Sequence, residues 1–177
     1  MSSRDGVNWN RFDEMFIGPG LEHERNWVYG DSSYPFYTLV ETPCEYPSRE
    51  KEISIMVTEG HWSGVSSPVY RYSMRLDGFA SYRSDYQIST LTTKPLIFSG
   101  EKLSINFSTS AIGWIYVDIL DINGNPIEKY HSCELFGNSL DREVWFGGTA
   151  DVSALAGRPV RLRFTMRDAD IYSFVFR

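Results

Sequence analysis

Alternation of apolar and polar residues is the main pattern of this chain, and it predicts strands. In residues 68–81 (PVYRYSMRLDGFAS), apolar side chains at 70, 72, 74 and 76 alternate with polar ones at 71, 73, 75 and 77. Successive side chains leave a strand on opposite faces, so this period of two is typical of a half-buried strand. The pattern ends at Asp77-Gly78, where glycine permits backbone angles that other residues resist. We predict that this segment is the strand by which the chain enters its main domain.

The residues before this strand predict a different kind of β-structure. Residues 51–58 (KEISIMVT) alternate again, whereas residues 21–47 contain three prolines and are predicted to be irregular, since proline cannot donate to a sheet. Residues 3–9 predict a tight turn at Asp5-Gly6, with Trp9 folded back over it. The chain begins almost inside this turn, so we expect it to begin partway through a larger architecture.

After residue 81, alternating segments follow one another to the end of the chain. Strands are predicted at 86–91, 103–108, 113–120, 127–131 and 144–146, with Asn123-Gly124 as a hairpin turn. Residues 151–157 predict one helical turn, and residues 160–176 a final hairpin that turns at 168–170. This arrangement predicts an all-β fold: an antiparallel, jelly-roll-like two-sheet β-sandwich over residues 68–177, preceded by a hairpin and an irregular linker over residues 1–67.

Composition and charge exclude several classes of function. The 177 residues are 42% hydrophobic and 23% charged, which is typical of a globular protein rather than a disordered one. A formal net charge of -6 argues against nucleic acid as a partner, because such a protein needs a basic surface. No apolar run approaches the ~20 residues of a membrane span, and the first ten residues contain no signal-peptide core. We expect a soluble chain that binds neither nucleic acid nor membrane.

The residues that most often carry chemistry form no recognisable set. The three histidines and two cysteines lie at spacings unlike those of a metal site. A disulfide between Cys44 and Cys133 is possible, but two separate buried thiols are favoured, because free cysteine behaves as a small hydrophobe. The chain has no nucleophile elbow, phosphate loop or zinc-protease motif, and no pair of its 23 acidic residues stands in a recognisable glycosidase setting. We expect no metal, no cofactor and no catalytic residue.

Two groups of residues are candidates for binding carbohydrate. Trp114, Tyr116 and Asp118 share one face of a predicted strand, where rings could stack on a sugar beside a hydrogen-bonding carboxylate. The favoured alternative is a strand that is buried on both faces. His61 and Trp62 lie in a Gly- and Ser-rich loop, a usual place for binding residues, although a tryptophan that fixes the loop to the core explains them equally well.

Arginines on the predicted outer faces are candidates for binding an anion, because guanidinium groups bind carboxylate or phosphate through two parallel hydrogen bonds. The favoured alternative is pairing with acidic residues across a solvated face, given the acidic net charge. These arginines are Arg71, Arg75, Arg161, Arg163 and Arg167. The residues that the sequence suggests for carbohydrate binding are His61, Trp62, Arg75, Asp77, Trp114 and Tyr116.

Several strings of the sequence resemble a known family. SRDGVNWNRF resembles the turn in the last blade of a five-bladed β-propeller of the glycoside hydrolase family 32 and 43 type. EISIMVTEGHWSG and YRYSMRLDGFAS resemble the closing strand of that propeller and its passage into a C-terminal β-sandwich. TKPLIFSGEKLSINF, GWIYVDILDINGNPI and VRLRFTMRDADIYSFVF are similar to that sandwich, so the resemblance covers nearly the whole chain.

The resemblance implies a non-catalytic role. In that family the catalytic carboxylates come from earlier blades, and Asp5 matches a turn residue rather than one of them. The implied function is an accessory β-sandwich of a carbohydrate-active protein, which packs on and stabilises a propeller or forms a homodimer through its N-terminal segment, residues 2–60. A free carbohydrate-binding module is the alternative, and an enzyme in its own right is the least favoured possibility.

Overall fold

The protein is all-β and antiparallel, as the sequence predicts. The structure is a computed structural model that describes residues 1–177 except 4, 24–25, 28–32, 45–50, 62–63 and 65. In this described part, the only helical segment is the single 3₁₀ turn η1 (Ser153–Leu155), which lies within the predicted helical turn. The chain forms two compact units, one of residues 1–43 and 52–74, the other of residues 44–51 and 75–177.

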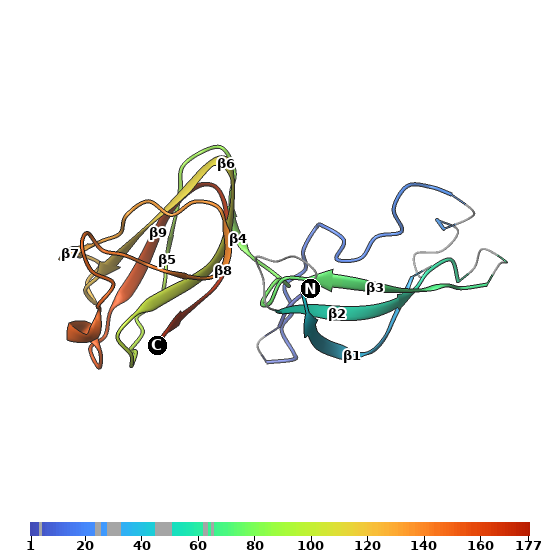
Figure 1. Cartoon of the computed structure of the whole chain (residues 1–177), viewed down its shortest axis with the longest axis horizontal. Coiled ribbons are helices and arrows are strands. Elements are labelled where there is room, and N and C mark those ends of the chain that lie inside the picture. Colours follow the sequence, from blue (N-terminus) through green and yellow to red (C-terminus); the bar gives the residue numbers. More distant parts are fainter. Residues whose placement is uncertain (4, 24–25, 28–32, 45–50, 62–63, 65) are drawn as a thin grey trace. The chain divides into compact units, whose positions relative to one another are not determined.

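The smaller unit contains a three-stranded sheet in the order β1–β2–β3. Its strands are β1 (Tyr34–Pro43), β2 (Lys51–Thr58) and β3 (Val69–Met74) (Figure 1). The strand predicted at 51–58 is confirmed, and its alternation buries Ile55 and Val57. The region predicted to be irregular contains β1, which tolerates its prolines because it is the edge of the sheet.

The segment from residue 68 lies in this smaller sheet and does not enter the sandwich as a strand. Strand β3 ends at Met74 and pairs with β2, so that Tyr72 lies opposite Ile55. After β3, the chain enters the larger unit at Arg75. Alternation shows that a strand is half-buried, but it does not show which sheet the strand joins, and this is why the sequence assigned β3 to the wrong sheet.

The larger unit is one curled six-stranded sheet in the order β4–β9–β6–β7, with β5 also on β9 and β8 also on β6 (Figure 1). Its strands are β4 (Tyr82–Ser84), β5 (Ser89–Thr92), β6 (Leu103–Leu120), β7 (Pro126–His131), β8 (Asn138–Glu143) and β9 (Arg161–Phe176). The hairpin predicted at Asn123-Gly124 joins β6 to β7, and Gly124 has the positive φ of 92° that such a turn requires.

A bend in the long β6–β9 pair gives the sheet its curl. The two strands pair from Leu103 opposite Phe176 to Leu120 opposite Arg161, with a register shift between Thr109 and Trp114. The final hairpin predicted with a turn at 168–170 is therefore wrong: β9 continues through these residues as one strand, and Asp168 bends it with a φ of 50°. The turn-forming residues were recognised, but bends and bulges use the same residues as hairpin turns.

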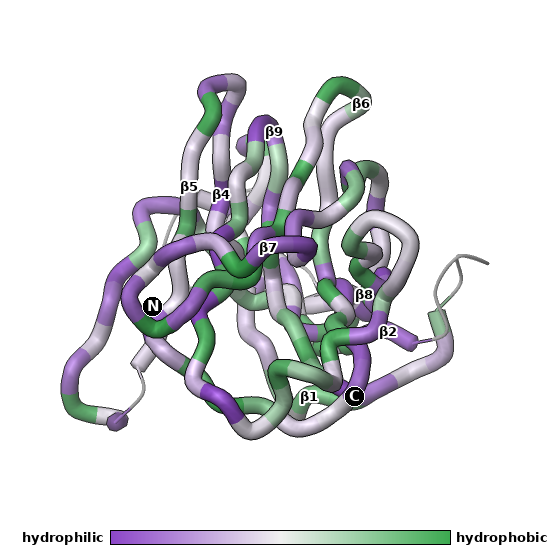
Figure 2. The backbone as a smooth tube through the Cα atoms, turned by 90° about the vertical axis from the view of Figure 1, so that its left-hand side faces the viewer, coloured by the Kyte–Doolittle hydropathy of each residue, from purple (hydrophilic) through white to green (hydrophobic). Residues whose placement is uncertain are grey.

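The curl brings both halves of β6 and β9 around one hydrophobic core. Figure 2 shows that hydrophobic and hydrophilic positions are interspersed along the strands of this unit, as expected when one face of each strand is buried. The predicted alternation of β6 is confirmed on both sides of its bend. Its fully buried side chains are Leu103, Ile105, Phe107, Ile115, Val117 and Ile119.

Candidate functional site

Three aromatic rings form a continuous row on the outer face of β6 and β7. The rings of Trp114 and Tyr116 meet edge to face, with centroids 5.3 Å apart and an interplanar angle of 62°. The ring of His131 stacks on Tyr116, at 5.4 Å and 11°. We call Trp114, Tyr116 and His131 the ring strip.

The local sequence explains why these rings share a face. Strand β6 sends Ile115 and Val117 into the core at 0% exposure, so Trp114 and Tyr116, which alternate with them, point outward. Trp114 and Tyr116 are half-buried, and the His131 side chain is 67% exposed. The outer face of β6 is therefore partly open to solvent, rather than buried as in the alternative considered from the sequence.

Polar groups hold the ring strip in position. The buried carboxylate of Asp118 contacts His131 Nδ1 through Oδ1 at 2.7 Å, while its Oδ2 accepts hydrogen bonds from Nε and Nη2 of Arg163 at 3.1 and 3.0 Å. The Tyr116 hydroxyl donates to Glu134 Oε2 at 2.9 Å. This hydrogen bond raises the pKa of Tyr116, because the carboxylate accepts the phenol proton and disfavours the phenolate. Both Tyr116 and His131 are thus anchored at the rim of the strip.

The sequence predicted part of this arrangement. Trp114, Tyr116 and Asp118 were expected on one face, whereas His131 and Glu134 were not proposed as members of the site. His131 had no usable signal, because a register shift between the Leu120–Pro126 pair and the Asp118–His131 pair means that a count back from the Asn123-Gly124 turn does not place His131 opposite Asp118. Glu134 had none either, because it lies beyond the last residue of β7.

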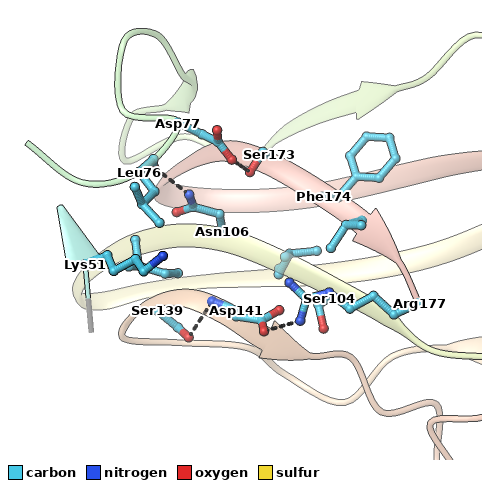
Figure 3. Close-up of a pocket in the computed structure, with 13 residues that line it drawn as sticks. Lys51, Leu76, Asp77, Ser104, Asn106, Ser139, Asp141, Ser173, Phe174 and Arg177 are labelled. Carbon is cyan, nitrogen blue, oxygen red and sulfur yellow. Dashed lines mark hydrogen bonds and ion pairs between the residues drawn. The ribbon is translucent and has the colours of Figure 1, made fainter. Parts of the chain in front are cut away.

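A cavity of about 640 Å³ lies on the other half of the curled sheet (Figure 3). Asp77 lines it from the turn before β4, and its Oδ2 accepts a hydrogen bond from the Ser173 hydroxyl at 2.6 Å. Asp141 lines it from β8 and forms an ion pair with Arg177. Since these carboxylates already interact with neighbouring side chains of the same cavity, the ring strip is the stronger candidate for ligand binding.

Arg75, the first residue of the larger unit after β3, lies inside the fold at 8% exposure. Its guanidinium carbon is 4.1 Å from the centroid of the Tyr172 ring. Its hydrogen bonds go to four oxygens of β6 and β8, at 2.6 to 3.0 Å: Asn106 Oδ1, Phe107 O, Asn138 Oδ1 and Ser139 O. These contacts give Arg75 a structural role, and it does not join the ring strip.

Of the two loop residues proposed from the sequence, His61 belongs to the smaller unit. His61 is exposed, and its ring centroid lies 4.8 Å from that of Tyr34 at an angle of 59°. Trp62 lies outside the described residues. The sequence candidates therefore separate into His61 in the smaller unit, Asp77 in the cavity, Arg75 in the interior, and Trp114 with Tyr116 in the ring strip.

The described residues contain neither a candidate metal site nor a disulfide. In that part of the chain, no group of three or more His, Cys, Asp or Glu side chains is placed to hold a metal ion. No disulfide joins Cys44 to Cys133, and Cys44 is half-buried while Cys133 is exposed, so the interpretation as two buried thiols is wrong. Within the same residues, no helix has the length and apolar character needed to cross a membrane.

No family model, curated protein or solved structure matches this chain. Its likeness to the propeller-associated sandwich remains an expectation that rests on the sequence strings quoted above.

Proposed function

We propose that the larger unit, a curled and sandwich-like sheet, is a non-catalytic carbohydrate-binding module that binds a glycan on the ring strip. The observation that carries this proposal is the row of three rings on one outer sheet face, with centroids spaced at 5.3 and 5.4 Å. Aromatic rings offer large apolar faces at low conformational cost, and the C–H faces of pyranose sugars are apolar. An elongated row suits a chain of sugars better than a single one.

The polar groups beside the rings are suited to form hydrogen bonds with the hydroxyl groups of a sugar. Sugar hydroxyls both donate and accept hydrogen bonds, so a site needs donors and acceptors at the edge of the apolar platform. Glu134 offers carboxylate oxygens next to the Tyr116 hydroxyl, and Arg163 offers guanidinium donors next to Asp118. The resemblance to a sandwich that accompanies glycosidase propellers is consistent with this function, and it favours an accessory module of a carbohydrate-active protein.

Removing a ring from the strip is expected to weaken glycan binding. Trp114→Ala and Tyr116→Ala should each lower the affinity at least about tenfold, because one stacked ring contributes on the order of 1.4 kcal/mol. Affinity electrophoresis against a panel of soluble polysaccharides, followed by calorimetry on the best ligand, measures the loss. Tyr82→Ala is the matched control, since Tyr82 is a 66% exposed aromatic residue on β4, which pairs with the other half of β9. Equal affinities for all three variants would contradict the proposal, as would binding of no polysaccharide by the native chain.

The smaller unit supports a second role, self-association, for a separate reason. Its described residues expose many large apolar side chains, at 45–90% of their surface: Trp9, Phe12, Met15, Phe16, Leu21 and Trp27. Burying ~400 Å² of such surface at about 25 cal/mol per Å² yields roughly 10 kcal/mol before the costs of association. We propose that a second copy of the chain covers this surface, in the two-fold arrangement most common among identical chains.

Charges placed on this surface are expected to separate the copies. The double variant Phe12→Asp, Leu21→Asp should be monomeric at concentrations where the native chain is a dimer, because a dimer interface would have to bury both carboxylates. Size exclusion coupled to light scattering, from low to high micromolar chain, gives the mass. Ile97→Asp is the control, a 68% exposed residue of the larger unit that should leave the dimer intact. A native chain that remains monomeric throughout would refute this role.

A further inference from the structure

A row of arginines runs along β9 directly beside the ring strip. In the β6–β9 register, Arg167 lies opposite Trp114, Thr165 opposite Tyr116, and Arg163 opposite Asp118. Side chains of directly opposed residues on one face start about 5 Å apart at their Cβ atoms. Arg161 follows on the same face, two residues before Arg163. We call Arg161, Arg163 and Arg167 the arginine ridge.

Two of these three cations have no carboxylate partner in the part of the chain that the structure describes. Arg163 is neutralised by Asp118 at 3.0 Å. Arg161 donates to backbone carbonyls, from Nε to Ile122 O at 3.1 Å and from Nη1 to Thr93 O at 3.2 Å. For Arg167, no ion pair is found among the described residues, and its buried Nε has no hydrogen-bond partner there.

The acidic groups nearest this surface are already engaged. Asp118 binds both Arg163 and His131, and Glu134 accepts the hydrogen bond of Tyr116. Asp168, next to Arg167 in sequence, accepts a hydrogen bond from the Ser110 hydroxyl at 2.6 Å. The hydroxyl donors do not neutralise Glu134 and Asp168, so the arginine ridge offers an anion the guanidinium groups of Arg161 and Arg167, which have no described carboxylate partner, rather than a net positive field.

We infer that the ligand of the ring strip is an acidic polysaccharide of the uronic-acid class, whose carboxylates face Arg167 and Arg161. The inference rests on the proposed function, since the rings bind the sugars and the ridge distinguishes acidic sugars from neutral ones. A guanidinium group binds a planar carboxylate through two parallel hydrogen bonds, which gives direction as well as attraction. Arg167 is the main specificity-determining residue, because it lies beside Trp114 and has no described partner to give up.

The test compares two forms of one polymer. Polygalacturonate carries free carboxylates, and its fully methyl-esterified form presents the same sugars without the charge. At low salt, the native chain should bind polygalacturonate at least about tenfold more tightly than the ester, and 1 M salt should remove most of this preference. Arg167→Gln should lower the affinity for polygalacturonate about tenfold and leave the affinity for the ester unchanged. Arg158→Gln is the control, because Arg158 is an exposed arginine outside the ridge.

The outcomes separate this inference from the proposed function. Equal affinity for acid and ester, with both lost in Trp114→Ala, would overturn the acidic preference and leave the carbohydrate-binding function standing. An equal loss on both polymers in Arg167→Gln would also overturn it. Dextran sulfate that binds as tightly as polygalacturonate, with the same dependence on Arg167, would overturn the assignment to carboxylates. Binding of no polymer at all would refute both proposals.

Discussion

Gly113→Ala is expected to destabilise the larger unit by at least about 3 kcal/mol, which corresponds to a loss of roughly 10 °C or more in melting temperature. Gly113 lies in β6 where the β6–β9 pair bends. A Cβ at this position would lie 2.2 Å from Asp168 O and 2.9 Å from Arg167 O. Both atoms are backbone of the partner strand, so no side-chain rotation relieves the clash, and the strands must separate where they now pair.

The matched control is Gly148→Ala, since a Cβ on Gly148 would meet no heavy atom within 4 Å. This variant should change stability by less than about 0.5 kcal/mol. Thermal unfolding followed by near-ultraviolet circular dichroism compares the two. If Gly113→Ala has the same melting temperature as the control, the close approach of β6 and β9 at the bend is not a requirement of this fold.

The bend also shows why the sequence predicted the fold class and most strand positions but not the connectivity. Alternation along β6 identified both buried halves, because each half follows the period of two that a sheet imposes. Whether two such halves form one strand or two depends on the partner strand, here β9, whose sequence is up to 73 residues away. Strands β4 and β8 were missed for a related reason: YRS and NSLDRE are short and largely polar, and tertiary pairing rather than pattern makes them strands.

In the candidate site, too, local relations along one strand could be predicted, whereas relations between strands could not. Trp114 and Tyr116 were identified because two residues apart on one strand is a local relation. His131 joined them only through the register of a hairpin, and Arg167 only through the pairing of β6 with β9. Arg75 and Asp77 belong to the same predicted polar row, yet β3 ends before both of them. Arg75 lies in the interior, whereas Asp77 lines the cavity. Local pattern thus identified the rings, whereas the cross-strand pairing determines what lies beside them.

Arg75→Met is expected to cost about 3 to 5 kcal/mol in the free energy of unfolding of the larger unit. Methionine fills a similar volume without the guanidinium, so the loss is one of hydrogen bonds rather than packing. Two amide oxygens, those of Asn106 and Asn138, and two backbone carbonyls would lose the donor that now satisfies them. A buried acceptor without a donor costs about 1–3 kcal/mol, and the contact with the Tyr172 ring is lost as well. The net loss is smaller than the sum over four acceptors, because the variant no longer has to bury a charged group.

Arg83→Met is the control for the general effect of removing a positive charge. The Arg83 side chain is 59% exposed and pairs with Asp170 at 3.0 Å, so its loss should cost less than about 1 kcal/mol. Arg75→Lys should fall between the two, because an ammonium group keeps the charge but cannot reach four acceptors in the geometry of the planar guanidinium. Urea denaturation of the three variants gives the order. If Arg75→Met proves as stable as Arg83→Met, the guanidinium is not what joins the start of the larger unit to β6 and β8.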